Sequence, residues 1–399
     1  MNLNRCFFLL AALLPLATSA PAQPASPASG LTNAAVARHA AGLRRTSIIY
    51  IACQGLAWGD LSCYGQTNFQ TPNLDRLAAG GTRCTDYEAV GDDLAQAQAA
   101  LMAGNHAAFS SGQVTLGARL QQAGYHTGLI GEWTLGPTPW TQGFDEFAGF
   151  LNQAEADNYY SDFIWRYAPK SVLDLTNRTL GDWAGREPMY ENAGGRKGKF
   201  MPDVLLSAAA NFVRVNAPDF ANRYRPFFLL VNLPAPHSVT PGKDDYPVPT
   251  DAPFTSEPWP QAAKNRAALV ARLDDGVGRL LEQLKKISLT NNVALFVSGA
   301  VAPEKFADPK LNFLKLKDEV RGGDAPARRR LPMLVYWPEQ VPAGQVSLMP
   351  WSACDVAPTA LEIARAKPAP SFTGVSVLPA LLGHAGTNAP VLPDRRPNP

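Results

Sequence analysis

Short runs of apolar, β-branched residues alternate with longer amphipathic segments along most of this chain. The apolar runs lie at residues 47–52, 126–131, 226–233, 292–298 and 331–337, and the amphipathic segments at 71–81, 91–105, 115–125, 204–215, 261–286 and 355–364. A short, unbroken apolar run predicts a strand that is buried on both faces, whereas apolar positions three and four residues apart predict a helix. Strands that alternate with helices predict an α/β sandwich with a largely parallel sheet.

The stretch from Ser47 to Gly65 joins the first predicted strand to a glycine-rich exit. Ligands of open α/β sheets are usually held at the carboxyl ends of such strands. We therefore expect Cys53, Gln54 and Gly55 to form the floor of any active site. These three residues offer little acid–base chemistry.

Three regions depart from the alternation of strands and helices. Residues 165–200 are rich in Gly, Asn, Arg and Lys and predict an excursion or a small hairpin, and the prolines of residues 238–258 predict an ordered surface loop. The tail from 383 to 399 is rich in Pro and Gly and is expected to be loose. The α/β domain is therefore predicted over residues 47–382.

The N-terminal segment has the pattern of a secretory signal. Arg5 precedes an apolar core at residues 6–14, and small residues follow up to an Ala-x-Ala-like site at residues 20–22. This order predicts a signal peptide over residues 1–22 and a flexible leader over 23–46. The apolar core is too short to span a bilayer. We expect export to the periplasm or the extracellular space, with no membrane attachment once the signal is removed.

Composition limits the function classes further. The chain has 399 residues, 46% of them hydrophobic, and a net charge of +2. This length can bury one large core, and the near-neutral charge argues against binding to nucleic acid.

Four cysteines remain after signal removal, and export would place them in an oxidising compartment. They are Cys53, Cys63, Cys84 and Cys354. Three pairings are open, and none of the spacings is that of a zinc site or a redox pair. We expect structural thiols or disulfides.

The order and the amino-acid sequences of many segments resemble the sulfatase family of the alkaline-phosphatase superfamily. These segments are GDLSCYG, TPNLDRLAAGGTRCTDYEAV, AALMAGN, TLGARLQQAGYHTGLIGEWTLG, QGFDEFAGF, FFLLVNLPAPH, LDDGVGRLLEQLKK, NNVALFVSG, LPMLVYWPE, DVAPTALEIA and GVSVLPALLG. Together they cover roughly residues 47–382. The resemblance implies an alkaline-phosphatase-like sandwich, with a mixed, mostly parallel sheet flanked by helices on both faces. It also implies that the small C-terminal subdomain of sulfatases is reduced or absent in this chain.

The resemblance implies that active relatives hold a divalent cation, usually calcium, with hard oxygen ligands. Relatives have two adjacent aspartates where this chain has Gln54 and Gly55, and an acidic and amide pair where it has Gly299 and Ala300. Calcium takes six to eight oxygen ligands, and of these positions only Gln54 offers an oxygen, which is uncharged. We therefore expect neither a metal site nor a calcium cofactor.

The nucleophile of the family is a formylglycine made from a cysteine or serine in a Cys-x-Pro-x-Arg context. Alignment on residues 99–104 places Leu94 at the nucleophile and Gln98 at the arginine. A leucine side chain has no heteroatom, so no formylglycine can form at position 94.

The remaining family positions are only partly kept. Glu132, in Gly-Glu-Trp-Thr, replaces a lysine that grips sulfate, whereas His237 matches the histidine that assists the leaving group. One histidine without a metal or a nucleophile cannot perform the reaction, so we expect His237 to be a relic or a structural residue. Arg321 falls near the position of a further sulfate-binding lysine. Our candidates for ligand contacts in the cleft are Gln54, Asp93, Glu132 and Arg321.

Three hypotheses remain for the function. The leading one is an exported, non-catalytic sulfatase-like protein that binds a sugar, an anion or a partner in the former cleft. The alternative is a sulfuric-ester (or related phosphate-ester) hydrolase with a rebuilt active site, in which Asp92 and Asp93 join Glu132 and His237. A simpler interpretation of the two aspartates is that they cap a helix N-terminus, where a carboxylate is favoured by about 0.3–1 kcal/mol. The third hypothesis is an interaction protein that uses an outer surface.

Overall fold

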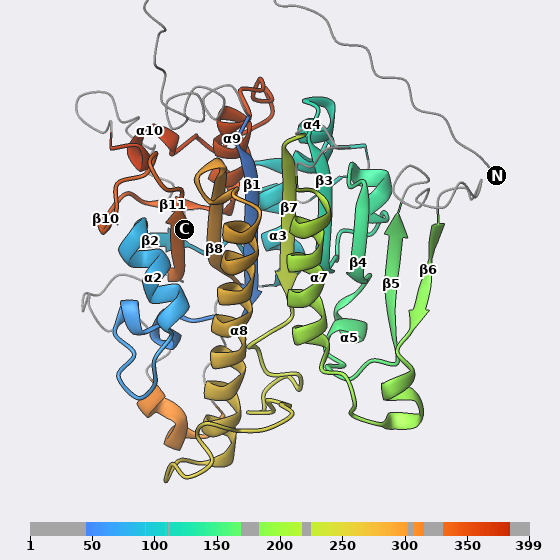
Figure 1. Ribbon diagram of the computed structural model, residues 1–399, viewed down its shortest axis with the longest axis vertical. Coiled ribbons are helices and arrows are strands. Elements are labelled where there is room, and N and C mark those ends of the chain that lie inside the picture. Colours follow the sequence, from blue (N-terminus) through green and yellow to red (C-terminus); the bar gives the residue numbers. More distant parts are fainter. Residues whose placement is uncertain are drawn as a thin grey trace, which may run out of the picture. The chain divides into compact units, whose positions relative to one another are not determined.

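A mixed sheet forms the centre of the computed structural model (Figure 1). The structure describes residues 45–91, 93–107, 109–110, 112–168, 183–217, 225–301, 307–314 and 330–383, which all belong to one compact unit. The predicted signal peptide, nearly all of the leader and the tail beyond 383 lie outside the described residues, so these predictions stay untested. Within the described ranges, none of the helices combines the length and apolar character needed to cross a membrane.

The described part of the sheet has eleven strands. Their bounds are β1 (Ser47–Gln54), β2 (Thr82–Glu88), β3 (His126–Glu132), β4 (Glu146–Phe150), β5 (Phe163–Ala168), β6 (Trp183–Pro188), β7 (Phe227–Leu233), β8 (Val293–Val301), β9 (Arg330–Tyr336), β10 (Gln345–Ser347) and β11 (Trp351–Ser352). The order is β10-β2-β9-β8-β1-β7-β3-β4-β5-β6, with β11 also paired to β2. The run from β8 to β4 is parallel, and β9, β5 and β6 are antiparallel to their inner neighbours. The prediction of a mixed, mostly parallel sheet is confirmed.

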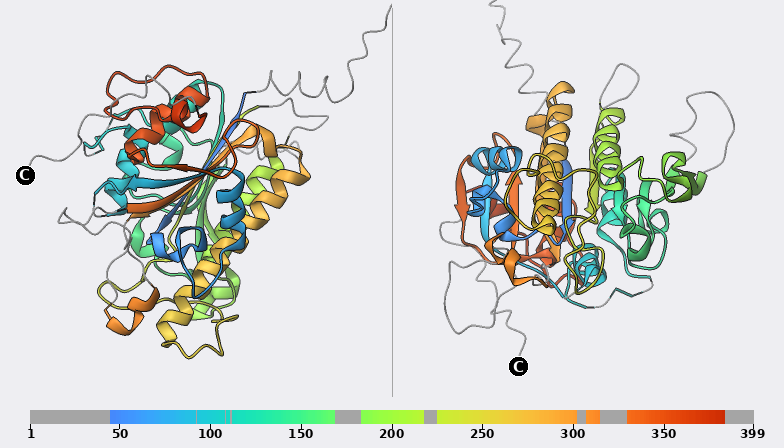
Figure 2. Two further views of the ribbon diagram at one scale, coloured as in Figure 1. Left: turned by 90° about the vertical axis from the view of Figure 1, so that its left-hand side faces the viewer. Right: turned by 90° about the horizontal axis from the view of Figure 1, so that it is seen from below.

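Helices cover both faces of the sheet, as the two views in Figure 2 show. On one face lie α2 (Pro72–Gly80), α7 (Met201–Val215) and α8 (Gln261–Lys286). On the other lie α3 (Leu94–Ala103), α4 (Leu116–Gln122), α9 (Ala353–Ile363) and α10 (Leu378–Leu381). Alternate residues of β1 supply both cores, because Ile49 and Ile51 face the first layer and Ile48 and Tyr50 the second. This explains why the sequence of β1 is apolar throughout.

Most predicted elements are found within a few residues of their expected bounds, and α8 matches its predicted range from end to end. The region 165–200 contains the hairpin strand β6, which is antiparallel to β5. Two details differ from the expectation. Strands β2 and β4 were not predicted, and β2 carries polar residues at half-buried positions. Thr71 precedes α2, but its hydroxyl bonds Ser62 and Asp75 instead of capping the helix backbone.

The cysteines are structural residues of the core. Cys53 and Cys84 are fully buried free thiols and Cys63 is a partly buried one. Burial raises the pKa of Cys63 and of Cys84 to about 12. These thiols are therefore unreactive at neutral pH.

A buried ion pair fastens the loops at the carboxyl edge of the sheet to α8. Arg266 of α8 donates to both carboxylate oxygens of Asp60, at 3.2 and 2.6 Å, and the two side chains are 2% and 1% exposed. The same guanidinium donates to the carbonyl oxygens of Gly55 at 2.9 Å and Pro236 at 2.8 Å. One side chain therefore joins the exits of β1 and β7 to the helix layer.

We expect Arg266→Met to destabilise the protein by about 3–5 kcal/mol, because it leaves Asp60 charged and buried without its partner. Arg272→Met on the same helix is the matched control, since Arg272 pairs with Asp203 at the surface with side chains 28% and 33% exposed. Its cost should be about 0–1 kcal/mol. Urea unfolding of both variants measures the difference, and equal costs would contradict the role given to Arg266.

Candidate functional site

The candidate site lies at the carboxyl ends of three adjacent parallel strands, β1, β7 and β3. Ala52 of β1 and Gly131 of β3 both lie beside Asn232 of β7 in the sheet register. Gln54 and Glu132 therefore end their strands one or two residues beyond the level of Asn232. Sequence analysis predicted this edge as the floor of the site, and the strand order confirms that these ends are neighbours.

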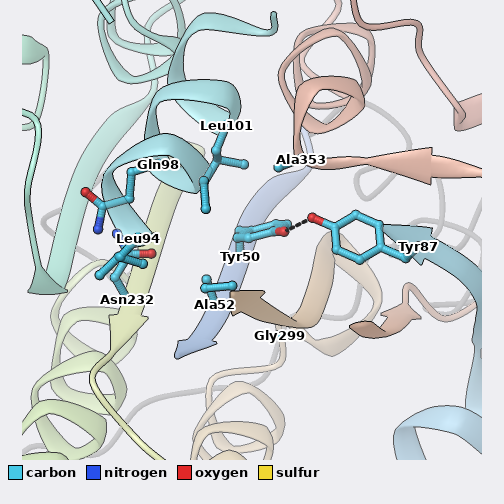
Figure 3. Close-up of a pocket in the computed structure, with 11 residues that line it drawn as sticks. Tyr50, Ala52, Tyr87, Leu94, Gln98, Leu101, Asn232, Gly299 and Ala353 are labelled. Atoms are coloured by element: carbon cyan, nitrogen blue, oxygen red, sulfur yellow. Dashed lines mark hydrogen bonds between the residues drawn. The ribbon is translucent and has the colours of Figure 1, made fainter. Parts of the chain in front are cut away.

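Helix α3 closes one side of this edge with leucine side chains. Leu94 and Leu101, one at each end of the helix, face Tyr50 and Ala52 of β1 (Figure 3). The cavity that remains between them has a volume of about 20 Å³. A single water needs about 10–15 Å³ by the same measure, so the space holds one water and no sulfate ester.

Two phenols and a serine line the far side of this small cavity. The hydroxyl of Tyr50 lies 2.9 Å from that of Tyr87 and 2.8 Å from Ser298 Oγ. Burial raises the pKa of Tyr50 to about 12. These hydroxyls satisfy one another and stay protonated, so they supply no base.

Gln98 fastens α3 to the exit of β3. Its amide nitrogen donates to the carbonyl oxygen of Glu132 at 2.9 Å, and its amide oxygen accepts from both the backbone and the hydroxyl of Thr134 at 3.0 Å. The Gln98 side chain is 3% exposed. The residue at the family's arginine position is therefore a fully used structural amide.

Gly55 has no room for a side chain. Its φ is +74°, and a Cβ built there would lie 2.7 Å from the Cβ and 2.8 Å from the Cα of His237. At Gly299 a Cβ would lie 2.6 Å from the carbonyl oxygen of Leu56. The backbone has closed in at two of the positions where the resemblance places cation ligands.

His237 follows β7 and is engaged through both ring nitrogens. Nδ1 donates to the carbonyl oxygen of Pro234, which accepts from the hydroxyl of Tyr159 as well. Nε2 lies 2.7 Å from Oδ1 of Asp157, the residue that ends α5 (Gln153–Ala156). This is an ion-pair distance, but its angles are not those of a hydrogen bond.

Glu132 is a carboxyl group enclosed in the protein interior. The residue is 0% exposed, and neither of its carboxylate oxygens has a hydrogen-bond partner among the described residues. Burial, and to a smaller extent the charge of Asp157, raises its pKa from the usual 4.5 to about 8. At neutral pH Glu132 is therefore mostly a neutral acid, which cannot replace the lysine that the resemblance places at this position.

The predicted site residues do not all lie at this edge. His237, Glu132 and Gln54 lie at this edge. Asp93 is exposed and caps α3 by accepting from the backbone of Gln96 at 2.8 Å. It is a helix cap, and the prediction of a cleft contact at Asp93 gains no support.

Arg321 and Asp92 lie outside the described residues. Sequence reasoning missed Asp157 and Asn232, which share the edge. The Asn ending an apolar strand in VNLPAPH was a usable signal for Asn232, whereas nothing in the sequence near Asp157 points to His237.

The donor set at this edge does not fit a calcium ion. Gln54 Oε1 is buried and without a partner, but it is neutral, and Gly55, Gly299 and Ala300 have no side-chain oxygen. Across the described part of the chain, no three His, Cys, Asp or Glu side chains are grouped so that they could hold a metal ion.

Gly55→Ala should lower the free energy of unfolding by more than Gly65→Ala. Both glycines have positive φ, at +74° and +106°, which costs an alanine about 1–2 kcal/mol. Only Gly55 adds a clash with backbone, typically worth a further 1–3 kcal/mol, because nothing lies within 4 Å of a Cβ at Gly65. Urea unfolding of the pair tests this, and similar losses would show that the exit of β1 adapts freely.

Glu132→Gln should remove part of the pH dependence of stability. The folded state holds the Glu132 proton more tightly than the unfolded chain, so wild-type stability falls as pH rises from about 4.5 through about 8. Glutamine has no proton to lose, and its advantage over wild type should grow over this range to the order of several kcal/mol. Thermal unfolding at successive pH values measures the difference. Glu187→Gln, at a surface residue 41% exposed, should show no such trend, and a constant offset at Glu132 would contradict the argument.

Comparison with known proteins agrees with this fold. The family model described as Sulfatase matches residues 46–366. Arylsulfatase G of Rattus norvegicus is 28% identical, over 87% of this chain and 71% of that protein, and N-acetylgalactosamine-6-sulfatase of Homo sapiens is 27% identical, over 84% and 66%.

Solved structures show the same likeness. The structure of Ps i-CgsB in complex with k-i-k-neocarrahexaose has a TM-score of 0.65 at 25% identity, covering 85% of this chain and 77% of that one. The phosphonate monoester hydrolase of Agrobacterium radiobacter shares the fold, with a TM-score of 0.56 at 17% identity and coverage of 85% and 77%. The match over residues 46–366 covers most of the sequence, and the chain belongs to the sulfatase family.

Proposed function

We propose that this chain is an exported, non-catalytic member of the sulfatase family that binds a ligand or partner at the remaining cleft. The observation that carries the proposal is Leu94. It occupies the nucleophile position and, with Leu101, narrows the adjoining cavity to about 20 Å³. A hydrocarbon side chain forms no covalent intermediate, and no ester fits beside it.

The electrostatics of the edge support the same proposal. Sulfate carries negative charge and needs cationic or donor groups around it. Here the lysine position holds Glu132, and the calcium positions hold one neutral amide and residues without side-chain oxygens. We therefore propose that the protein works without calcium and without formylglycine.

A rebuilt hydrolase is a second candidate because Asp157 and His237 form a close acid–base contact. A histidine that assists a leaving group needs one ring nitrogen free to reach it. In His237, Nδ1 faces a carbonyl oxygen and Nε2 faces Asp157. The contact therefore favours a structural or ligand-binding role over proton transfer to an ester.

The proposal predicts no hydrolysis above the buffer blank with 4-nitrophenyl sulfate or 4-nitrophenyl phosphate, with or without added calcium, between about pH 5 and 9. Mass spectrometry should find Leu94 unmodified, and elemental analysis should find no stoichiometric metal. The control is His237→Ala, prepared in the same way, because a contaminating hydrolase would act equally in both samples. Turnover that His237→Ala abolishes would overturn the proposal.

A further inference from the structure

In the candidate site, several side-chain donors form hydrogen bonds with backbone carbonyl oxygens, whereas several side-chain acceptors have no partner among the described residues. The amide nitrogens of Gln98 and Asn232 both donate to the carbonyl oxygen of Glu132, at 2.9 and 3.1 Å. Tyr159 and His237 Nδ1 donate to the carbonyl oxygen of Pro234. All four donors therefore point at backbone carbonyls of the strand exits.

Several hydrogen-bond acceptors at the same edge have no donor within the described part of the chain. Three buried side chains contribute oxygens without a hydrogen-bond partner among the described residues: Gln54 Oε1, both carboxyl oxygens of Glu132 and Asn232 Oδ1. The half-buried Asp157 adds a carboxylate whose Oδ1 is in ion-pair contact with His237. The first three of these residues are 7%, 0% and 2% exposed. Buried acceptors without partners are rare in native proteins, and each one costs free energy until a donor reaches it.

These groups lie close together. The register places the ends of β1, β7 and β3 side by side, Gly55 touches His237, and His237 contacts Asp157. Asp157 is also near enough to Glu132 for its charge to act on that carboxyl. The Asp157 side chain is 23% exposed and the His237 side chain 13%, so this pair forms the solvent side of the cluster and Glu132 its buried side.

We propose that this acceptor cluster, formed by Gln54, Glu132, Asp157 and Asn232, binds the primary ammonium group of a cationic ligand. The inference rests on the proposed function and names the class of ligand for the former cleft. An ammonium group brings three donors and a positive charge, which match neutral amide oxygens and carboxylates together.

Other ligand classes fit this cluster less well. An anion would face the carboxyl groups of Glu132 and Asp157, which repel it when they are ionised. A divalent metal needs several ligands at short range, and no three His, Cys, Asp or Glu side chains of the described residues are grouped so that they could hold one. A cation that donates hydrogen bonds compensates the negative charge of the carboxylates and also supplies donors to the acceptors that have no partner among the described residues.

Binding should be coupled to the proton on Glu132. Two groups interact electrostatically with this carboxyl, Asp157 after α5 and Tyr159 in the following loop. Asp157 in turn contacts His237 after β7. With a pKa of about 8, Glu132 carries a proton at pH 6.5 that an incoming cation displaces. The ionised fraction rises roughly 25-fold between pH 6.5 and 8.5, and the apparent affinity for an ammonium group should rise by the same factor.

Isothermal titration calorimetry of the full chain with methylammonium chloride, in buffers of different ionisation enthalpy, tests the proposal. We expect close to one proton released per methylammonium bound at pH 6.5, about a quarter of a proton at pH 8.5, and roughly 25-fold tighter binding at the higher pH. Tetramethylammonium, which has charge but no donors, should bind at least tenfold more weakly.

Three variants make the result specific. Glu132→Gln is isosteric and should abolish the proton release and the pH dependence, and Asp157→Asn should weaken binding at both pH values. Glu187→Gln, on the surface of β6, should behave as wild type. The inference is overturned if methylammonium does not bind, if Glu132→Gln binds it with unchanged proton release, or if sodium sulfate binds instead.

These outcomes are separate from those of the ester assays. Hydrolysis dependent on His237 would remove the proposed function whatever the calorimetry shows. Absence of methylammonium binding, with no hydrolysis, would remove only the ligand class.

Discussion

A single buried ion pair, Arg266 with Asp60, holds the carboxyl edge of the sheet in shape. Two opposite charges in the interior tolerate each other only while they stay paired, so the loops that carry them cannot drift. The guanidinium also donates hydrogen bonds to the carbonyl oxygens of Gly55 and Pro236. Gly55 packs against His237, and Pro236 is the residue before His237 in the chain. The positions of Gly55 against His237, and of His237 against Asp157, depend on this anchor.

Under the proposed function, the edge around that anchor has changed its chemistry while keeping its framework. Leucines of α3 fill the space beside β1, and amide side chains turn their donors toward backbone carbonyls. The positive charge is missing as well, because a buried carboxyl that is mostly protonated at neutral pH stands where the family resemblance places a lysine. The result is an edge short of donors and rich in acceptors, which suits a different partner from the sulfate of the relatives.

The sequence was sufficient for the framework, and it was insufficient for the new contacts. Apolar runs such as 226–233 predicted β7 because burial on both faces leaves a clear pattern, and the structure has Leu94 and Glu132 at this edge. Strand β2 was not predicted because polar residues at its half-buried positions interrupt that pattern. Asp157 escaped because its contact with His237 joins loops 80 residues apart in the chain, and no local rule encodes such a distance. For Asp93, the sequence offered both a cleft contact and the simpler interpretation of a helix cap, and the residue caps α3.

The left-handed turn at Gly55 bears on the history of this chain. A carboxylate cannot return to position 55 until His237 withdraws and the turn changes its hand, and either change alone loosens the exit of β1 without providing a cation ligand. A lineage that restored the carboxylate by single substitutions would pass through less stable sequences, in which the first substitution does not yet provide a cation ligand. Under the proposed function, the loss of that carboxylate is hard to reverse, and selection on the descendants of this sequence can refine a new use of the edge far more readily than it can restore the old one.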